Sequence, residues 1–306
     1  MSQTDDPSAT ADDLSLPFQL ESTGLRGRIV RMGDSIDAIL GAHDYPEPVS
    51  RRLAELLVLA ATLSGNLKFN GRFSLQARGN GPVSMLLADC THDGRMRGYA
   101  RFDAEKVDAL EDTSAVPDLL GAGYLVLAVD QGPERDQYQG MVELAGESLK
   151  DCMLAYFRRS EQVQTGLTVA VERTGEGWRG GGILVQRMPD PSATPERDAI
   201  EDWRRTMMLL GSATANEVLA PGLSAERLLF RLFHEEGVRV YERLDLSFGC
   251  RCNEKRVRDM LAMFSPAELD DMRLEDGSIA VTCEFCGAGY TFNEAEIDAL
   301  RATKLH

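Results

Sequence analysis

Periodic apolar positions predict a mixture of strands and helices in the first part of the chain. Apolar side chains recur on one helical face over 49–66, which indicates an amphipathic or largely buried helix. Apolar and polar residues alternate over 72–78, as in a half-buried strand, and further strands are predicted at 25–31, 83–90 and 96–102. The Asp93-Gly94 pair between the last two strands is typical of a tight hairpin turn.

The same patterns continue to about residue 188. They predict strands at 123–130 and 138–144, a helix at 147–162, and two closing strands at 168–172 and 183–186. Together these elements predict an α+β fold, with a strand-rich N-terminal domain and packed helices over 16–190, which is long enough to fold independently. We expect the acidic segment before it, 1–15, to be a disordered tail.

Three prolines between Pro189 and Pro195 indicate a domain boundary, because proline interrupts regular structure. Helices are predicted beyond it at 196–210 and 224–234, and we assign 191–245 to a helical linker region. The second helix carries its apolar residues on one side: Leu228, Leu229, Leu232 and Phe233. The region is too short to bury both helices alone, so we expect it to pack on the larger domain or on a partner.

The last part of the chain, 246–306, combines short helices with one hairpin. Ser265 is a predicted N-cap with Pro266 at the first helical position, which favours a helix over 266–272. The other predicted elements are a helix at 256–264, strands at 279–282 and 290–292, and a final helix from Asn293 to about Thr303. A segment this small rarely supplies enough hydrophobic core and needs a covalent or metal staple.

Four of the six cysteines can supply that staple, as a Cys-x-Cys pair (Cys250 and Cys252) and a Cys-x-x-Cys pair (Cys283 and Cys286). Two close thiol pairs brought together by a loop suit a tetrahedral zinc ion. Gly287, after the second pair, allows the backbone to turn tightly beneath a metal. Structural zinc contributes roughly 10–16 kcal/mol in small modules, against about 5–15 kcal/mol for the stability of a whole domain. We therefore expect loss of zinc to unfold this segment.

Two interpretations of the zinc centre remain open on these residues alone. The spacing favours a passive structural zinc ribbon, as in a non-enzymatic binding or regulatory protein. The alternative is a redox switch, in which oxidation to disulfides ejects the metal, since each cysteine has a neighbour that can resolve a sulfenic acid. Arg251, Lys255 and Arg256 would favour the thiolate that such a switch requires.

No other residues form a recognisable active site, and we predict that the protein is not an enzyme. Cys90 and Cys152 lie in apolar surroundings and are expected to be buried and inert. The four histidines form no metal-ligand pattern. The run from Arg179 to Gly182 lacks the residues and context of a phosphate-binding loop, and we interpret it as a glycine-rich turn or bulge.

Charge and hydropathy limit the partners. A formal net charge of −16 over 306 residues disfavours nucleic acid, because phosphate binding requires a basic face. The polar, acidic N-terminus has no signal-peptide features, and no apolar run is long enough to cross a bilayer. We expect a cytoplasmic protein without a membrane partner, in which paired cysteines indicate metal or redox chemistry more than structural disulfides.

With these residues in view, the chain resembles the heat-shock protein 33 family of redox-regulated holdase chaperones over about 25–292. Its most specific element is the set of two cysteine pairs with this spacer. Three further motifs, in the same order as in the family, are Gly94-Arg95-Met96-Arg97-Gly98-Tyr99-Ala100, Tyr156-Phe157-Arg158-Arg159-Ser160-Glu161-Gln162 and Gly181-Gly182-Ile183-Leu184-Val185-Gln186-Arg187-Met188-Pro189.

The resemblance implies that the four cysteines bind zinc when reduced. Under oxidative stress combined with unfolding conditions it implies that neighbouring cysteines pair, Cys250 with Cys252 and Cys283 with Cys286, that zinc leaves, and that the C-terminal segment and linker unfold. The active form would bind unfolding client proteins without ATP and associate as a homodimer. Asn253 and Glu254 depart from the serine and basic residue that the family often has there, and the acidic N-terminal extension lies outside the shared pattern.

Overall fold

The computed structural model describes residues 12–65, 71–111, 114–131, 138–187 and 196–303. The chain divides into two compact units, Met1–Phe248 and Gly249–His306. Both units combine strands with helices, so the predicted α+β class is confirmed. Within the described residues, no helix is long and apolar enough to cross a membrane.

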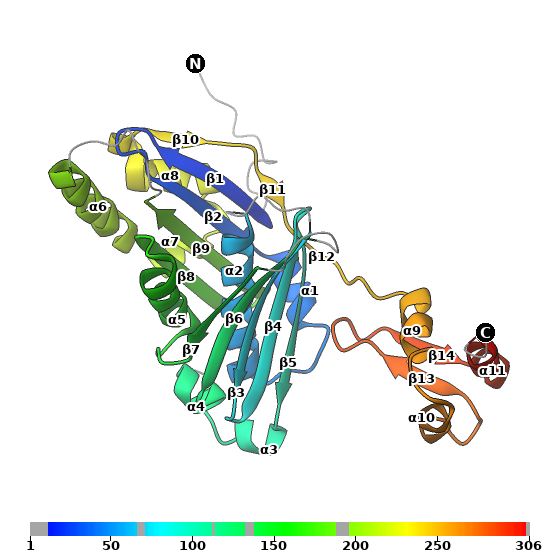
Figure 1. Cartoon of the computed structure of the whole chain (residues 1–306). Helices are drawn as coiled ribbons and strands as arrows, with labels where there is room; N and C mark the ends of the chain where they lie inside the picture. The colour runs from blue at the N-terminus through cyan, green and yellow to red at the C-terminus, as the bar shows by residue number, and fades with distance from the viewer. Residues whose placement is uncertain (1–11, 66–70, 112–113, 132–137, 188–195, 304–306) are drawn as a thin grey trace. The chain divides into compact units, whose positions relative to one another are not determined.

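Two six-stranded sheets form the framework of the first unit (Figure 1). The first sheet has the order β10-β1-β2-β9-β8, with β11 also paired to β1; its strands are β1 (Leu14–Leu20), β2 (Arg26–Met32), β8 (Thr165–Thr174), β9 (Gly177–Gln186), β10 (Val238–Val240) and β11 (Leu244–Asp245). The second has the order β12-β5-β4-β3-β6-β7, built from β3 (Arg72–Gly79), β4 (Val83–Thr91), β5 (Arg95–Phe102), β6 (Gly123–Asp130), β7 (Tyr138–Glu143) and β12 (Ser247–Phe248). Gly94 has φ +82° in the β4–β5 turn, which is the conformation that the Asp93-Gly94 pair predicted.

Helix α2 (Glu47–Ser64) runs between the two sheets and packs on strands of both (Figure 1). Fifteen of its 18 residues are buried, because an apolar helix between two layers must bury almost its whole circumference. The main core is built around it, with α1 (Asp34–Leu40) and α5 (Leu149–Tyr156) alongside. The shorter elements of this unit are α3 (Ala104–Val107), α4 (Val116–Leu120) and the π-turn η2 (Phe157–Glu161).

Three helices cover the other face of the first sheet: α6 (Glu196–Gly211), α7 (Ala215–Leu219) and α8 (Ala225–Phe233). Leu228, Leu229, Leu232 and Phe233 of α8 are buried in a second apolar cluster with residues of β1 and β2. The described part of the expected linker region thus packs within the first unit. A charged contact adds to this packing, since the Arg205 side chain of α6 donates to the Glu236 carboxylate in η3 (His234–Glu236), which also accepts from the Ser22 hydroxyl.

The segment Val238–Phe248, which we call the strap, connects these helices to the first cysteine pair. It pairs first with β1 through β10 and β11, and then with β5 through β12. The strap therefore lies along β1 of one sheet and β5 of the other, and the second unit begins directly after it, at Gly249.

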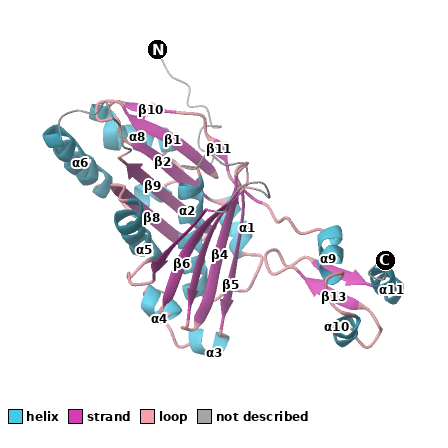
Figure 2. Cartoon of the chain, viewed as in Figure 1, coloured by secondary structure: helices cyan, strands magenta, loops and turns pink. Residues whose placement is uncertain are grey.

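The second unit is small. Helices α9 (Glu254–Leu261), α10 (Pro266–Asp271) and α11 (Glu294–Thr303) accompany one hairpin, β13 (Ile279–Thr282) with β14 (Gly289–Phe292) (Figure 2). Ser265 caps α10 in a reciprocal capping box with Glu268, as its position before Pro266 predicted. The described core of the unit contains six buried side chains: Val257, Leu261, Leu269, Ile279, Phe292 and Ile297.

The expected N-terminal tail is too long at its inner end. Leu14 and Ser15 belong to β1, and the Asp13 carboxylate accepts hydrogen bonds from the backbone N–H groups of Gly33, Asp34 and Ser35. This carboxylate supplies the cap at the start of α1, where unpaired N–H groups favour a negative charge. The polar, acidic composition of this segment predicted disorder. It could not indicate that the Asp13 carboxylate binds backbone groups about twenty residues further along the chain. Residues 1–11 of the expected tail lie outside the described residues.

The interpretation of the run from Arg179 to Gly182 as a turn or bulge is wrong. These residues lie in β9 and pair regularly with β2 and β8. Helices approach both faces of the strand here: a Cβ on Gly180 would lie 2.7 Å from Val58 of α2, and one on Gly181 would lie 2.7 Å from Val218 of α7. These glycines are needed because the helices approach the sheet closely. In the sequence, a run of glycines in a strand looks the same as a run of glycines in a turn, which is why a turn was predicted.

The close approach predicts that Gly181→Ala destabilises the first unit by about 1–3 kcal/mol, the range for overpacking a well-packed core. The free energy of unfolding, measured by denaturant titration, tests this. Gly175→Ala in the β8–β9 turn is the matched control, because no atom lies within 4 Å of its Cβ position. Equal stability of the two variants would contradict the proposed packing constraint.

Candidate metal centre

The two cysteine pairs come from separate segments of the second unit. Cys250 and Cys252 precede α9, and Asn253 next to them caps that helix by accepting from the Arg256 N–H at 2.9 Å. Cys283 and Cys286 lie in the turn between β13 and β14.

Backbone hydrogen bonds define that turn. The Cys283 N–H donates to the Ala288 carbonyl at 2.9 Å, and the Gly287 N–H donates to the Cys283 carbonyl at 2.9 Å. Gly287 has φ +69°, so the glycine after the second pair does adopt the left-handed turn that its position predicted.

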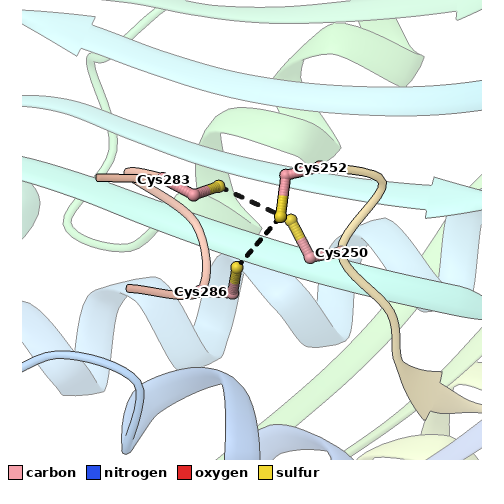
Figure 3. A group of neighbouring side chains, drawn as sticks. All are labelled: Cys250, Cys252, Cys283 and Cys286. Carbon is pink, nitrogen blue, oxygen red and sulfur yellow. Dashed lines mark hydrogen bonds between the residues drawn. The ribbon is translucent and has the colours of Figure 1, made fainter. Parts of the chain in front are cut away.

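The four sulfur atoms converge, and each points toward the others (Figure 3). All lie within 4.8 Å of one another, with Cys250 Sγ 3.6 Å from Cys283 Sγ and Cys252 Sγ 3.3 Å from Cys286 Sγ. Tetrahedral zinc with Zn–S bonds of about 2.3 Å has S···S edges of about 3.8 Å. The cluster can therefore hold a metal ion, and its four sulfur donors are compatible with zinc.

The cluster changes the protonation of its own thiols. Partial burial tends to raise the pKa of Cys250, but hydrogen bonds from Cys252 and from the thiols of Cys286 and Cys283 outweigh it and lower that pKa to about 7. Burial, together with hydrogen bonds to the neighbouring sulfurs, raises the pKa of Cys286 to about 12. The cluster therefore favours a thiolate at Cys250, a form that a bound cation would stabilise further.

Two of the basic residues near the first pair, Lys255 and Arg256, have other partners. The Arg256 guanidinium donates to the Arg251 carbonyl at 2.9 Å, and the Lys255 ammonium lies 3.5 Å from the Asp259 carboxylate. The lowered pKa of Cys250 results from hydrogen bonds with the neighbouring sulfurs and the Cys252 backbone. The sequence pattern had instead predicted that basic side chains would favour the thiolate.

Tyr290 was not predicted from the sequence to be part of the site, yet its hydroxyl donates to Cys252 Sγ at 3.2 Å. This hydrogen bond raises the pKa of Tyr290 to about 12. Strand pairing places Tyr290 opposite Val281, two residues before Cys283. The signal for this contact is the hairpin predicted over 279–292. Its register, counted outward from the cysteine turn, places residue 290 next to the cysteine segment.

The other two cysteines are buried in the first unit, as predicted. Cys90 accepts a hydrogen bond from the Ser64 hydroxyl at 3.3 Å, and burial raises the pKa of Cys90 to about 11. Burial also raises the pKa of Cys152. Both thiols therefore stay protonated near neutral pH, which lowers their reactivity.

The Tyr290 hydroxyl predicts a measurable effect on the cluster. Tyr290→Phe removes the hydrogen bond that stabilises negative charge on Cys252 and leaves the ring in place. We expect weaker zinc binding and several-fold faster zinc release by peroxide, because an unshielded thiolate is more nucleophilic. Competition with a chromogenic chelator and the rate of zinc release measure the two effects.

Tyr241→Phe is the matched control, because its hydroxyl donates to Gln19 at 2.7 Å in the first unit. Zinc affinity and release rate that are the same in Tyr290→Phe, Tyr241→Phe and the unaltered protein would show that the Tyr290 hydroxyl does not influence the cluster.

Comparison with known proteins covers both units. The family model described as Hsp33 protein matches residues 13–293. Among curated relatives, the 33 kDa chaperonin of Caulobacter vibrioides is 41% identical over 286 residues, covering 91% of this chain and 94% of the relative. That of Azotobacter vinelandii is 38% identical over 292 residues, covering 95% of each chain.

A solved structure supports the same fold. The 33 kDa chaperonin of Thermotoga maritima superposes with a TM-score of 0.79 at 23% identity, covering 96% of this chain and 99% of that one. The family match, the curated relatives and the fold agree over nearly the full length, and the chain therefore belongs to the Hsp33 family of chaperones.

Proposed function

We propose that this protein is a redox-regulated, ATP-independent holdase of the cytoplasm. It binds unfolding client proteins when the normally reducing cytoplasm becomes oxidising. The convergence of four cysteine sulfurs in a unit with a very small core is the observation that carries the proposal. Membership of the Hsp33 family supports the chaperone activity. No combination of catalytic groups was found in the sequence, which is consistent with a non-enzymatic role.

The proposed switch begins with the reduced cluster. Zinc, when bound, would join the two cysteine segments and hold their sulfurs as thiolates. One thiolate of a pair attacks hydrogen peroxide, takes one oxygen as a sulfenic acid and releases hydroxide. Its neighbouring thiolate then displaces a second hydroxide and forms the disulfide, so each pair gives up two electrons to one peroxide.

We propose that the disulfides join Cys250 to Cys252 and Cys283 to Cys286, as the family resemblance implies. The sulfur contacts at 3.6 Å and 3.3 Å run between the two pairs, but in a tetrahedron every sulfur lies close to the other three. Pairing within each segment would leave no link between the segments. The second unit would then lose the connection that compensates for its small core.

Unfolding of the second unit is proposed to extend into the strap and the helices before it. The six buried side chains in the described part of this unit are too few to offset the conformational entropy of its chain, Gly249–His306. In α8 the four buried side chains from Leu228 to Phe233 would become an apolar surface for clients on undocking. The active form is proposed to be a homodimer, and the net charge of −16 would help to keep its client complexes soluble.

The first prediction concerns the thiols and the metal. Peroxide at mildly elevated temperature should release one zinc per chain and lower the number of free thiols from six to two, because Cys90 and Cys152 stay buried and protonated. Suppression of the aggregation of a heat-unfolded client should appear with the same time course. Chelator absorbance follows zinc release, thiol titration the free thiols, and light scattering the client aggregation, while peptide mapping identifies the disulfide partners.

The double variant Cys90→Ala with Cys152→Ala is the control, and its switch should be unaffected. Zinc release without any gain of aggregation suppression would leave a passive zinc ribbon as the better description. Disulfides mapped between the two pairs would keep a redox switch and contradict the proposed pairing.

The second prediction concerns the contact between Arg205 and Glu236. Arg205→Met removes the ion-pair partner of a carboxylate that is 3% exposed, which weakens the docking of α6. The Arg205 side chain is 41% exposed, so we expect a modest loss of about 1 kcal/mol, and a thermal midpoint about 2–4 °C lower. The oxidised variant should therefore gain aggregation suppression at a correspondingly lower temperature.

Arg204→Met is the matched control, since Arg204 and its partner Glu201 are both exposed and their charged atoms are 3.9 Å apart. An activation temperature that does not change in Arg205→Met would show that the release of α6 does not limit activation.

A further inference from the structure

The first unit contains a pocket of about 830 Å³ that the proposed switch does not use. Its walls come from both sheets, with Gln186 of β9 on one side and Leu127 and Val129 of β6 on the other. The end of α2 closes it at Leu63, and the π-turn η2 adds Phe157. The volume lies within the range of about 300–1,000 Å³ that is usual for small-molecule sites.

Most of the lining is apolar or aromatic. The rings that contribute are those of Phe18, Phe73, Tyr138, Tyr156, Phe157 and Tyr241. A lining of this kind suits the apolar body of a ligand, and a few polar groups then fix its orientation.

Two arginines of β2 line the pocket, and Arg28 is the buried one, whereas Arg26 is exposed. Arg28 is 6% exposed, so it is buried by more than nine-tenths. Burial lowers the pKa of Arg28 to about 10, so the guanidinium remains charged at neutral pH. A buried charge is expected to have a partner of opposite charge, because removing it from water is costly.

The partners of Arg28 compensate only part of that charge. Its Nη1 donates to the Ser15 hydroxyl at 2.8 Å and its Nη2 to the Gly65 carbonyl at 2.6 Å. Both acceptors are neutral, although the C-terminal end of α2 at Gly65 contributes about half a negative charge. In the described part of the chain no carboxylate lies within ion-pair distance of this guanidinium, and its buried Nε has no hydrogen-bond acceptor.

Glu161 is the acidic group of the lining, and it is already engaged. Its carboxylate accepts hydrogen bonds from the hydroxyls of Tyr138 and Tyr156. The pocket therefore has the incompletely paired Arg28 guanidinium near the end of α2. It has the Glu161 carboxylate, which already accepts two hydrogen bonds, at η2. A second anionic group on a ligand would meet the Glu161 charge, so one anion is favoured over two.

We propose that this pocket binds a small molecule with an apolar chain and one carboxylate, whose charge pairs with Arg28. The apolar chain lies against the aromatic walls, and the carboxylate lies against the Arg28 guanidinium, whose charge has only neutral partners in the described part of the protein. This site is separate from the cysteine cluster, and the proposal does not depend on the redox switch.

The test uses dodecanoate, with dodecanol as the uncharged analogue, on the full reduced chain in isothermal titration calorimetry. We expect saturable binding of one dodecanoate per chain and at least tenfold weaker binding of dodecanol. Arg28→Met should lose at least tenfold in dodecanoate affinity, whereas Arg28→Lys, which keeps the charge, should lose less.

Arg28→Met should also remain folded, because replacing an incompletely paired buried charge by an apolar side chain is often neutral or stabilising. Its thermal midpoint checks this point. Arg95→Met is the matched control, since Arg95 is half exposed and pairs with Asp93 at 2.9 Å; dodecanoate should bind it as it binds the unaltered protein.

Three results would overturn the proposal. They are the absence of saturable dodecanoate binding below the concentration at which dodecanoate self-associates, equal affinities for dodecanoate and dodecanol, and unchanged dodecanoate affinity in a folded Arg28→Met variant.

Discussion

The mutual approach of four cysteine sulfurs is the interaction on which the second unit depends. Among the described residues its core has six buried side chains, which is less apolar burial than normally offsets chain entropy. The sulfurs bring two separate segments of the unit together, since one pair precedes α9 and the other lies in the β13–β14 turn. The same sulfurs repel one another when ionised, and a bound cation would offset that repulsion. The stability of this unit is thereby tied to the chemical state of four atoms.

The first unit is built on the opposite principle. Helix α2 is buried between two sheets, and glycines in β9 let helices approach the first sheet from both faces. Apolar burial distributed over many residues makes such a core insensitive to the oxidation of any one side chain. One chain thus joins a unit with a large core to a unit with a small described core and a cysteine cluster, which would suit the proposed switch, in which the second unit unfolds and the first stays folded.

Sequence reasoning predicted the elements whose signals are local. The helix around Leu57, the hairpin at Gly94 and the cysteine turn at Gly287 were all predicted, because periodicity and positive-φ glycines are properties of short segments. It missed features that depend on contacts distant in sequence: Asp13 at the start of α1, the glycines of β9 beneath helices, and the Tyr290 hydroxyl at Cys252. The charge of Arg28 was overlooked because the sequence does not reveal that it is buried.

The strap also has a consequence for the exposed backbone of the sheets. Strands β1 and β5 would otherwise end their sheets with unpaired N–H and C=O groups, and the strap pairs with part of both. Open edge strands invite pairing with other extended chains, including copies of the same protein. Because one segment pairs with both strands, its detachment would expose both edges at once. Detachment of the strap would therefore change the tendency of the protein to self-associate as well as its affinity for other chains.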